Sequence, residues 1–417
     1  MQKHFITLLF TLSLTGLNFA NAYEMETTFH GVLDLRATVT DSLTGNYTQG
    51  GYGKFALNDG ESFTLAQAGG EIALNWDNGL SVHAVANAYK NNGDFKLGLT
   101  EGYIKYSGLP NASGYRWQSK LGVFYPKISL ENNAYAWASK NTLNSSSLNT
   151  WIGEEIRVLG NEITLTRLGR INKAPFDLSL TVSAFVNNDP AGSMLSWHGW
   201  TISNRQTLYT EKIQLPYFKA RMQGYDLYEQ ASSSDPFLEV DDRVGGHVRA
   251  EIKFHKKGAI SAGYYNNNGK PYIVDNGQYA WKTRFTHIDL TWLLPQGIVL
   301  TSQLLHGDTL MQSPLKTDVV NNDYTNGYIA LSKRIKAHRI TSRIERFNVK
   351  DNDKTVGDNN TERGKAFTLN YTYRLSKPWF LSTEFTWIDS YRPGRMYTNQ
   401  PINLTERQLA FAARYFY

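Results

Sequence analysis

Stretches in which every second residue is apolar recur along almost all of this 417-residue chain, and this period of two constrains the fold most. In such a stretch, successive side chains point to opposite faces. In residues 29–40, "FHGVLDLRATVT", one face holds Leu33 and Leu35 and the other holds Asp34 and Arg36. Burying a polar face in a soluble core would be costly. We therefore expect strands with one wet face and one apolar face.

The same alternation predicts sixteen strands in all, the first of them at 29–40. The other fifteen are expected at 64–76, 80–90, 97–107, 115–125, 155–167, 175–187, 243–254, 259–266, 280–294, 298–309, 325–335, 338–349, 364–375, 380–391 and 405–417. Short turns such as "DNG" alternate with long polar loops between these strands. Short periplasmic turns, long extracellular loops and an even strand number are typical of an antiparallel outer-membrane barrel. The alternative, a soluble sandwich or propeller, fits less well the length of the strands and their wet second face.

The chain ends on "LAFAARYFY", an alternating stretch whose last member is Tyr417 itself. Chain ends are usually solvated, so an apolar end indicates a packed element. Tyr, Phe and Trp make up 13% of the chain although all hydrophobic residues reach only 41%. This balance suits a wall that is apolar on one side with aromatic girdles at its rims. The sequence has no cysteine, which excludes disulfides and thiolate metal sites.

The first 22 residues have the features of a secretory signal peptide. Lys3 precedes a mostly apolar run from residue 5 to 17, and "ANA" at 20–22 fits a cleavage site. The run is too short for a transmembrane helix. We expect a mature chain that begins at Tyr23 and comprises the barrel, residues 23–417.

Together these features resemble the 16-stranded bacterial outer-membrane porins, whose last strand also ends on an aromatic residue. Weaker local matches, "GVFYPKISLEN", "IRVLG" and "AFVNNDPAG", resemble the phosphate-selective porins. The resemblance implies that the last strand closes the barrel and is recognised by the barrel-assembly machinery. It also implies a homotrimer.

The cost of placing charge in lipid, about 2–4 kcal/mol for an Arg near the midplane, predicts which strand faces point inward. The expected pore-lining residues are Arg36, Glu71, Glu101, Arg116, Lys120, Arg249, Lys253, Asp289, Arg339 and Arg343. Basic residues slightly outnumber acidic ones, which favours a mild preference for anions. Between Val158 and Ile163 the apolar residues change face, which predicts a bulge or a start outside the membrane.

Two connections are long enough to fold into the lumen. Residues 126–154 follow the fifth strand, as the constriction loop of porins does, and mix charges with aromatic rings. The expected constriction residues are Lys127, Glu131, Asn132, Trp137, Lys140 and Trp151. The alternative is an extracellular flap. The second connection, 188–242, is too long for an unstructured loop, and we expect local order in it.

No motif in the sequence indicates an enzyme, a metal site or a cofactor, and no nucleotide fingerprint or nucleic-acid partner is expected. We therefore interpret the chain as an outer-membrane porin for passive diffusion of small hydrophilic solutes or anions, surrounded by lipid and lipopolysaccharide. Two alternatives remain. One is a hydrolase at the outer rim using Ser196 and His198. The other is a structural or adhesion barrel plugged by 188–242.

Overall fold

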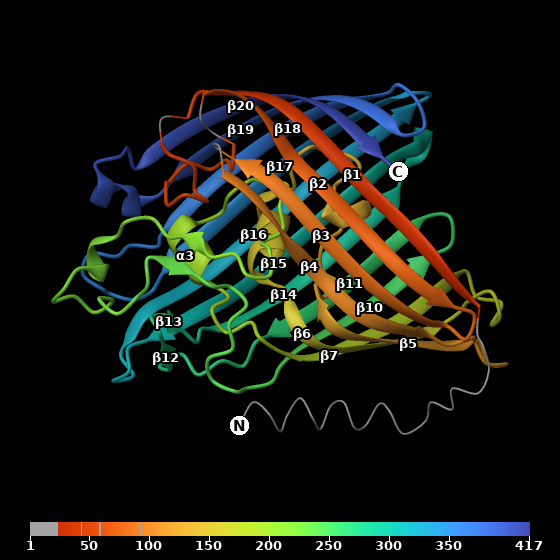
Figure 1. Cartoon of the computed structure of the whole chain (residues 1–417), viewed down its shortest axis with the longest axis horizontal. Coiled ribbons are helices and arrows are strands. Elements are labelled where there is room, and N and C mark those ends of the chain that lie inside the picture. Colours follow the sequence, from red (N-terminus) through yellow and green to blue (C-terminus); the bar gives the residue numbers. More distant parts are fainter. Residues whose placement is uncertain (1–23, 43, 58–59, 92–93) are drawn as a thin grey trace.

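A computed structural model describes residues 24–42, 44–57, 60–91 and 94–417. The expected signal peptide, residues 1–22, lies outside the described residues. The described chain forms one closed barrel of sixteen strands (Figure 1). Every strand pairs antiparallel with its neighbours in the ring, and the last pairs with the first. The predicted all-β, 16-stranded antiparallel barrel is confirmed.

The barrel strands match the predicted stretches to within four residues, except that β16 begins seven residues before its predicted start. They are β1 Met25–Thr40, β2 Glu61–Trp76, β3 Leu80–Asn91, β4 Asp94–Ser107, β5 Tyr115–Phe124, β6 Val158–Arg167, β7 Phe176–Val186, β10 Gly245–Phe254, β11 Gly258–Asn266, β14 Lys282–Leu293, β15 Ile298–Gln312, β16 Asp318–Ile335, β17 His338–Asp351, β18 Glu362–Arg374, β19 Trp379–Tyr391 and β20 Asn403–Phe416. The turns 77–79, 255–257 and 336–337 lie at one end of the barrel, and the long loops lie at the other.

The seam of the barrel lies where the two ends of the chain meet. Val32 is opposite Phe416, and the register continues to Thr40 opposite Gln408. Beyond the last strand residue, the Tyr417 amide donates to the Gly31 carbonyl at 3.2 Å, and the Gly31 amide donates to the Tyr417 carbonyl at 3.1 Å. A Cβ at Gly31 would lie only 2.6 Å from the Gly69 carbonyl oxygen as well as 2.3 Å from the Tyr417 ring, so glycine is required for this close approach. The apolar terminus is therefore the closing edge.

Inward and outward faces alternate as the sequence predicts. On β17, Ile340 and Ile344 are 50% and 57% exposed on the outside, whereas Arg343 between them is 1% exposed on the inside. The outer wall is thus an apolar surface that suits lipid.

The predicted bulge near Val158 is wrong. β6 pairs with β5 and β7 without a register shift. Val158 faces inward although it is apolar, because the lumen contains an apolar cluster that buries it. The irregularities lie instead at Asp34/Leu35, Val85/Ala86 and Met311/Gln312.

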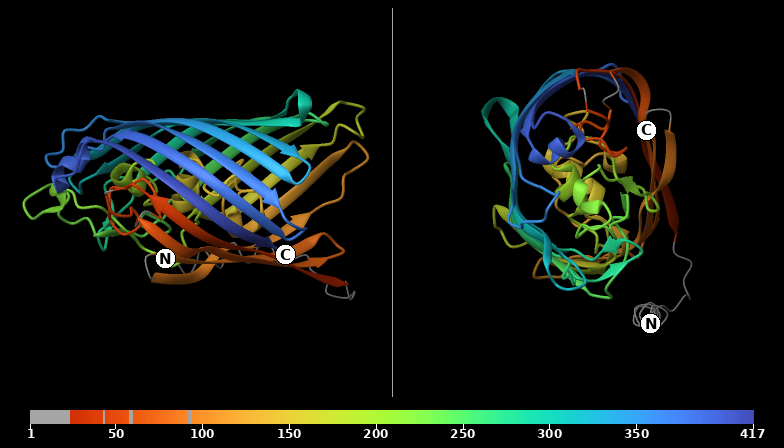
Figure 2. Two further views of the ribbon diagram at one scale, coloured as in Figure 1. Left: turned by 90° about the horizontal axis from the view of Figure 1, so that it is seen from above. Right: turned by 90° about the vertical axis from the view of Figure 1, so that its left-hand side faces the viewer.

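Segments between strands fold into the ring, where coiled ribbons are visible when the barrel is viewed along its length (Figure 2, right). No described helix is long and apolar enough to cross a membrane. The smaller elements are η1 Tyr135–Trp137, α2 Ser147–Glu155, α3 Ser193–His198, η2 Lys219–Arg221, η3 Pro295–Gly297, η4 Pro393–Thr398, and the strand pairs β8 Ile213–Gln214 with β9 Ser233–Ser234 and β12 Val274–Asp275 with β13 Gln278–Tyr279.

Candidate functional site

The lumen contains a buried apolar cluster made by the inward-folded segments and the inner wall. Leu148, Trp151 and Ile152 of α2 meet Leu195 of α3, and wall residues complete the cluster. The Trp151 ring contacts the rings of Trp200, Phe285 and Tyr324 edge-on, with centroids 5.8, 5.4 and 5.5 Å apart. Phe285 lies on β14 and Tyr324 on β16. Both 126–154 and 188–242 therefore pack against the inside of the barrel.

Four of the expected pore-lining residues face inward but are buried beneath these segments. They are Arg36, Arg249, Asp289 and Arg343. This differs from the expectation that they line a water-filled pore. The physical reason is that a buried charge needs a partner in place of water. The 126–154 segment supplies partners to Arg36 and Arg343. Neighbouring wall residues supply them to Arg249 and Asp289.

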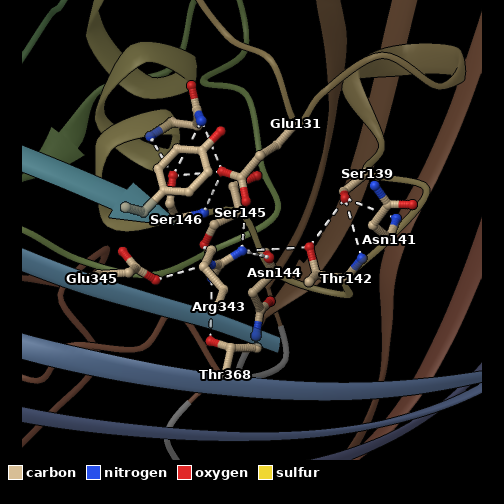
Figure 3. A network of polar contacts seen from close by, with 12 residues as sticks. Glu131, Ser139, Asn141, Thr142, Asn144, Ser145, Ser146, Arg343, Glu345 and Thr368 are labelled. Atoms are coloured by element: carbon tan, nitrogen blue, oxygen red, sulfur yellow. Dashed lines mark hydrogen bonds and ion pairs between the residues drawn. The ribbon is translucent and has the colours of Figure 1, made fainter. Parts of the chain in front are cut away.

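Arg343 shows this pairing most completely (Figure 3). Its Nη1 donates to Glu131 of the 126–154 segment at 2.7 Å, and its Nε donates to Glu345 on the same strand at 2.8 Å. It also donates to the carbonyls of Asn144 and Ser145 at 3.0 and 2.9 Å. Arg343 thus ties the inward segment to β17.

Arg36 and Arg249 are held in similar networks. Arg36 pairs with Asp34 at 2.8 Å and donates to the Leu143 carbonyl at 2.7 Å. Arg249 pairs with Glu251 at 2.6 Å and lies 3.7 Å from Asp289. Arg36 therefore joins the wall to the 126–154 segment, whereas the carboxylate partners of Arg249 both lie on wall strands.

The other expected wall residues are more accessible. Lys120 pairs with Glu162 at 3.2 Å and lies 4.4 Å from the Phe124 ring centre. Glu71 accepts from the Ala136 amide at 2.6 Å, and Glu101 is 3.5 Å from the Gln206 side-chain nitrogen. Arg116 is half-buried, Lys253 is exposed, and half-buried Arg339 donates to the Lys140 carbonyl at 2.6 Å.

The expected constriction residues have different surroundings within 126–154. Asn132 donates to Ser145 Oγ at 2.8 Å. The Trp137 ring packs on the Tyr125 ring, and their centroids are 4.7 Å apart. Glu131 and Trp151 hold the segment to the wall, as described above. Lys127 and Lys140 are exposed. The Lys127 ammonium lies 3.6 Å from a carboxylate oxygen of Glu251. Whether this segment limits solute passage stays a prediction.

A basic cavity of about 520 Å³ lies at the short-turn end of the lumen, and we call it the vestibule. Its described lining contains no aspartate or glutamate. Its cationic and imidazole lining residues are His30, Lys140, Arg334, His338, Arg339, Arg374, Lys377 and Arg414. Arg414 pairs with Asp34 at 3.1 Å. Lys140, Arg334, Arg339, Arg374 and Lys377 form no ion pair with any carboxylate in the described part of the chain.

Sequence reasoning found Lys140 and Arg339 of this vestibule but missed Arg334, Arg374 and Lys377. A signal was present, because these three cations lie at strand ends or in a turn on the short-turn side. Aromatic residues of the same lining, among them Phe380 and Tyr417, add apolar surface to the site.

The residues of the proposed hydrolase site do not lie on an open rim. Ser196 and His198 are both buried in α3. Ser196 Oγ accepts from Asn322 at 3.0 Å, and His198 Nε2 lies 2.9 Å from the Gln214 carbonyl. Ser196 and His198 are thus hydrogen-bonded to other residues and not to one another.

Three acidic residues lie close together where the two ends of the 188–242 connection meet. Carboxylate oxygens of Asp189, Glu239 and Asp241 all lie within 4.8 Å of one another. Asp189 accepts from the amides of Val240 and Asp241 at 2.6 and 3.1 Å. Burial, and next the charge of Glu239, raise the pKa of Asp189 to about 8. This shift favours the protonated form of Asp189.

No known family model matches this chain, and no curated protein is detectably similar to it. Solved structures do resemble it. The trimer form of OmpT, an outer membrane protein of Vibrio cholerae, aligns with a TM-score of 0.54 and 7% identity over 94% of this chain and 99% of that chain. The outer membrane channel DcaP of Acinetobacter baumannii aligns with a TM-score of 0.54 and 12% identity over 94% and 97%. The chain therefore has the fold of bacterial outer-membrane β-barrels.

Proposed function

We propose that this chain is a porin of the bacterial outer membrane through which small hydrophilic solutes diffuse passively, with a preference for anions. The closed barrel with an apolar outer wall supports the location and the class. The likeness to an outer membrane channel supports it further. In this proposal residues 1–22 direct secretion, the barrel-assembly machinery inserts the chain, and lipid and lipopolysaccharide surround it. A homotrimer is proposed because one similar structure is described as a trimer.

The vestibule carries the proposed preference for anions. Five cations without carboxylate partners lie around one cavity at the exit of the lumen. Charges of one sign in a cleft with low-dielectric walls raise the local concentration of the opposite ion. Anions should therefore be enriched there and cations depleted. The segment 126–154 is proposed to limit solute size, because it packs across the lumen next to this cavity.

Reversal potentials in a planar bilayer under a KCl gradient test this proposal. The wild-type chain should be selective for chloride. The triple variant R334Q/R374Q/K377Q removes three vestibule charges and should shift the reversal potential toward cation selectivity. The control K316Q/K350Q/K354Q removes three exposed cations at the opposite end and should leave the potential unchanged. Equal potentials for wild type and vestibule variant would contradict the assignment.

A plugged structural barrel is the second candidate, because the apolar cluster occupies part of the lumen. Such a barrel would pass little current, so conductance separates it from a porin. We do not propose the hydrolase, because Ser196 and His198 are buried and bonded to other residues.

A further inference from the structure

A basic groove lies on the outer wall of the barrel, on the side opposite to the lumen. Its volume is about 670 Å³, and β17, β18, β19 and the start of β20 line it. Arg346, Arg363 and Lys365 supply its cations, and all three side chains are exposed. Their strand neighbours Glu345, Phe347 and Glu362 are buried on the inside, so the alternation places the three cations outside.

The groove lies at the upper edge of the apolar wall. Along β17 the outward residues are Ile340 and Ile344, followed by Arg346, and the strand then enters the long loop 352–361. Along β18 the outward Arg363 and Lys365 come directly after that loop, and apolar residues follow them. Long loops are extracellular in this fold, so the groove lies at the level of the outer leaflet's headgroups.

Two of the three cations face one another across the strands, although Lys365 also lies directly opposite Asp389 of β19 in the register. Arg346 and Lys365 are directly opposite in the register, and Arg363 lies diagonally from Arg346. Like charges opposite one another destabilise a sheet. None of the three forms an ion pair with a carboxylate in the described part of the chain. Asp389, the one acidic residue of the lining, accepts from Thr405 at 2.9 Å.

Neighbouring aromatic rings hold two of these cations in place. The Arg363 guanidinium lies 4.5 Å from the Tyr391 ring centre, and the Lys365 ammonium lies 5.5 Å from the Trp387 ring centre. Such contacts keep a cation at the lipid boundary without neutralising it. Arginine pairs well with phosphate because its planar fork can donate two hydrogen bonds at once.

We propose that this groove binds the phosphate groups of the outer-leaflet glycolipid, lipopolysaccharide, through Arg346, Arg363 and Lys365. The diphosphorylated headgroup of this lipid offers charges at the required level, while its acyl chains follow the apolar wall below. The inference rests on the proposed outer-membrane location but not on conduction. A purely solvated patch would have no preference among lipids.

Native mass spectrometry of the full purified chain with diphosphoryl lipid A tests the proposal. The wild type should retain this lipid at least about tenfold better than R346Q/R363Q/K365Q, since each basic residue contributes to attraction of anionic headgroups. Replacing charge by a neutral amide on the outer wall does not oppose insertion. The control K173Q/K256Q/K257Q removes three exposed cations from short turns and should bind lipid A as the wild type does.

Two further lipids identify what the groove recognises. Phosphatidylethanolamine and phosphatidylglycerol should both bind more weakly than diphosphoryl lipid A, with no difference between wild type and groove variant. Equal retention of lipid A by wild type and groove variant would overturn the proposal. So would binding of phosphatidylglycerol as strong as that of lipid A. Conductance measured on the same preparations reports separately on the channel, so a failure of either proposal is visible alone.

Discussion

At the scale of single residues, the charges on the inner wall divide into two groups with different roles. Arg36, Arg249 and Arg343 are buried and paired with carboxylates, and Arg36 and Arg343 also donate to loop carbonyls. Arg334 and Arg374 are without carboxylate partners in the vestibule. A buried charge is stable only when it is paired, whereas a solvated charge is available to a passing ion. We expect the first group to hold the fold and the second to select solutes.

Arg343 allows a direct test of the structural role. The variant R343M leaves Glu131 and Glu345 near one another without their cation, which should destabilise the packed segment by about 3–5 kcal/mol. The expected result is a lower melting temperature of the purified barrel and faster proteolysis within 126–154. The half-buried Arg116 has no carboxylate partner in the described residues, so R116Q should melt as the wild type does.

The double replacement of both glutamates supplies a rescue. R343M/E131Q/E345Q removes both carboxylates that pair with Arg343, although Glu384 stays nearby, so part of the lost melting temperature should return. A variant R343M that melts like the wild type would contradict the bracing role of Arg343.

The direction of these side chains could be predicted from sequence, but their burial could not. The period of two and the cost of charge in lipid place Arg343 inside and Ile344 outside, as observed. Whether Arg343 meets water or Glu131 depends on how a segment some 200 residues away folds. Alternation along one strand contains no information about that contact.

At the scale of elements, the inward-folded segments explain where the sequence reading was incomplete. The alternating pattern predicts that every inward residue is polar and every outward residue is apolar. Val158 and Phe285 are apolar but face inward. Their burial is favourable because α2 and α3 bring apolar side chains to meet them. The strands themselves could be predicted because their period is local. The packing of the loops could not, because it depends on partners far apart in the chain.

The connection 188–242 should respond to pH through Asp189. In the folded chain its pKa is raised to about 8, whereas an unfolded aspartate ionises near its ordinary value of about 3.9. The folded state therefore binds more protons between these values, and its stability is lost as pH rises through about 8. Ionised Asp189 would repel Glu239 and Asp241 and loosen the base of the loop.

Limited proteolysis of the loop across this range measures the effect. Cleavage within 188–242 should be slow at acidic pH and faster above pH 8 in the wild type. In D189N the side-chain carbonyl can still accept from Val240 but cannot ionise, so the pH dependence should largely disappear. Identical pH profiles for the two proteins would count against this role of Asp189.

At the scale of the whole molecule, the fold was the most predictable level and the openness of the lumen the least. Sixteen alternating stretches, short turns and the terminal Tyr417 specify a closed barrel, and β20 closes it by pairing with β1. The wall alone would enclose a wide channel. The segments inside the ring reduce it, and their effect on passage depends on side-chain packing that the strand pattern does not encode.

Single-channel recording of the purified full chain in a planar lipid bilayer tests the central claim, that this barrel encloses a water-filled passage. We expect discrete current steps whose size rises in proportion to the KCl concentration, because ions cross an aqueous channel by diffusion. A correctly folded and inserted barrel that gives no such steps would contradict the proposed channel and would favour the plugged structural barrel.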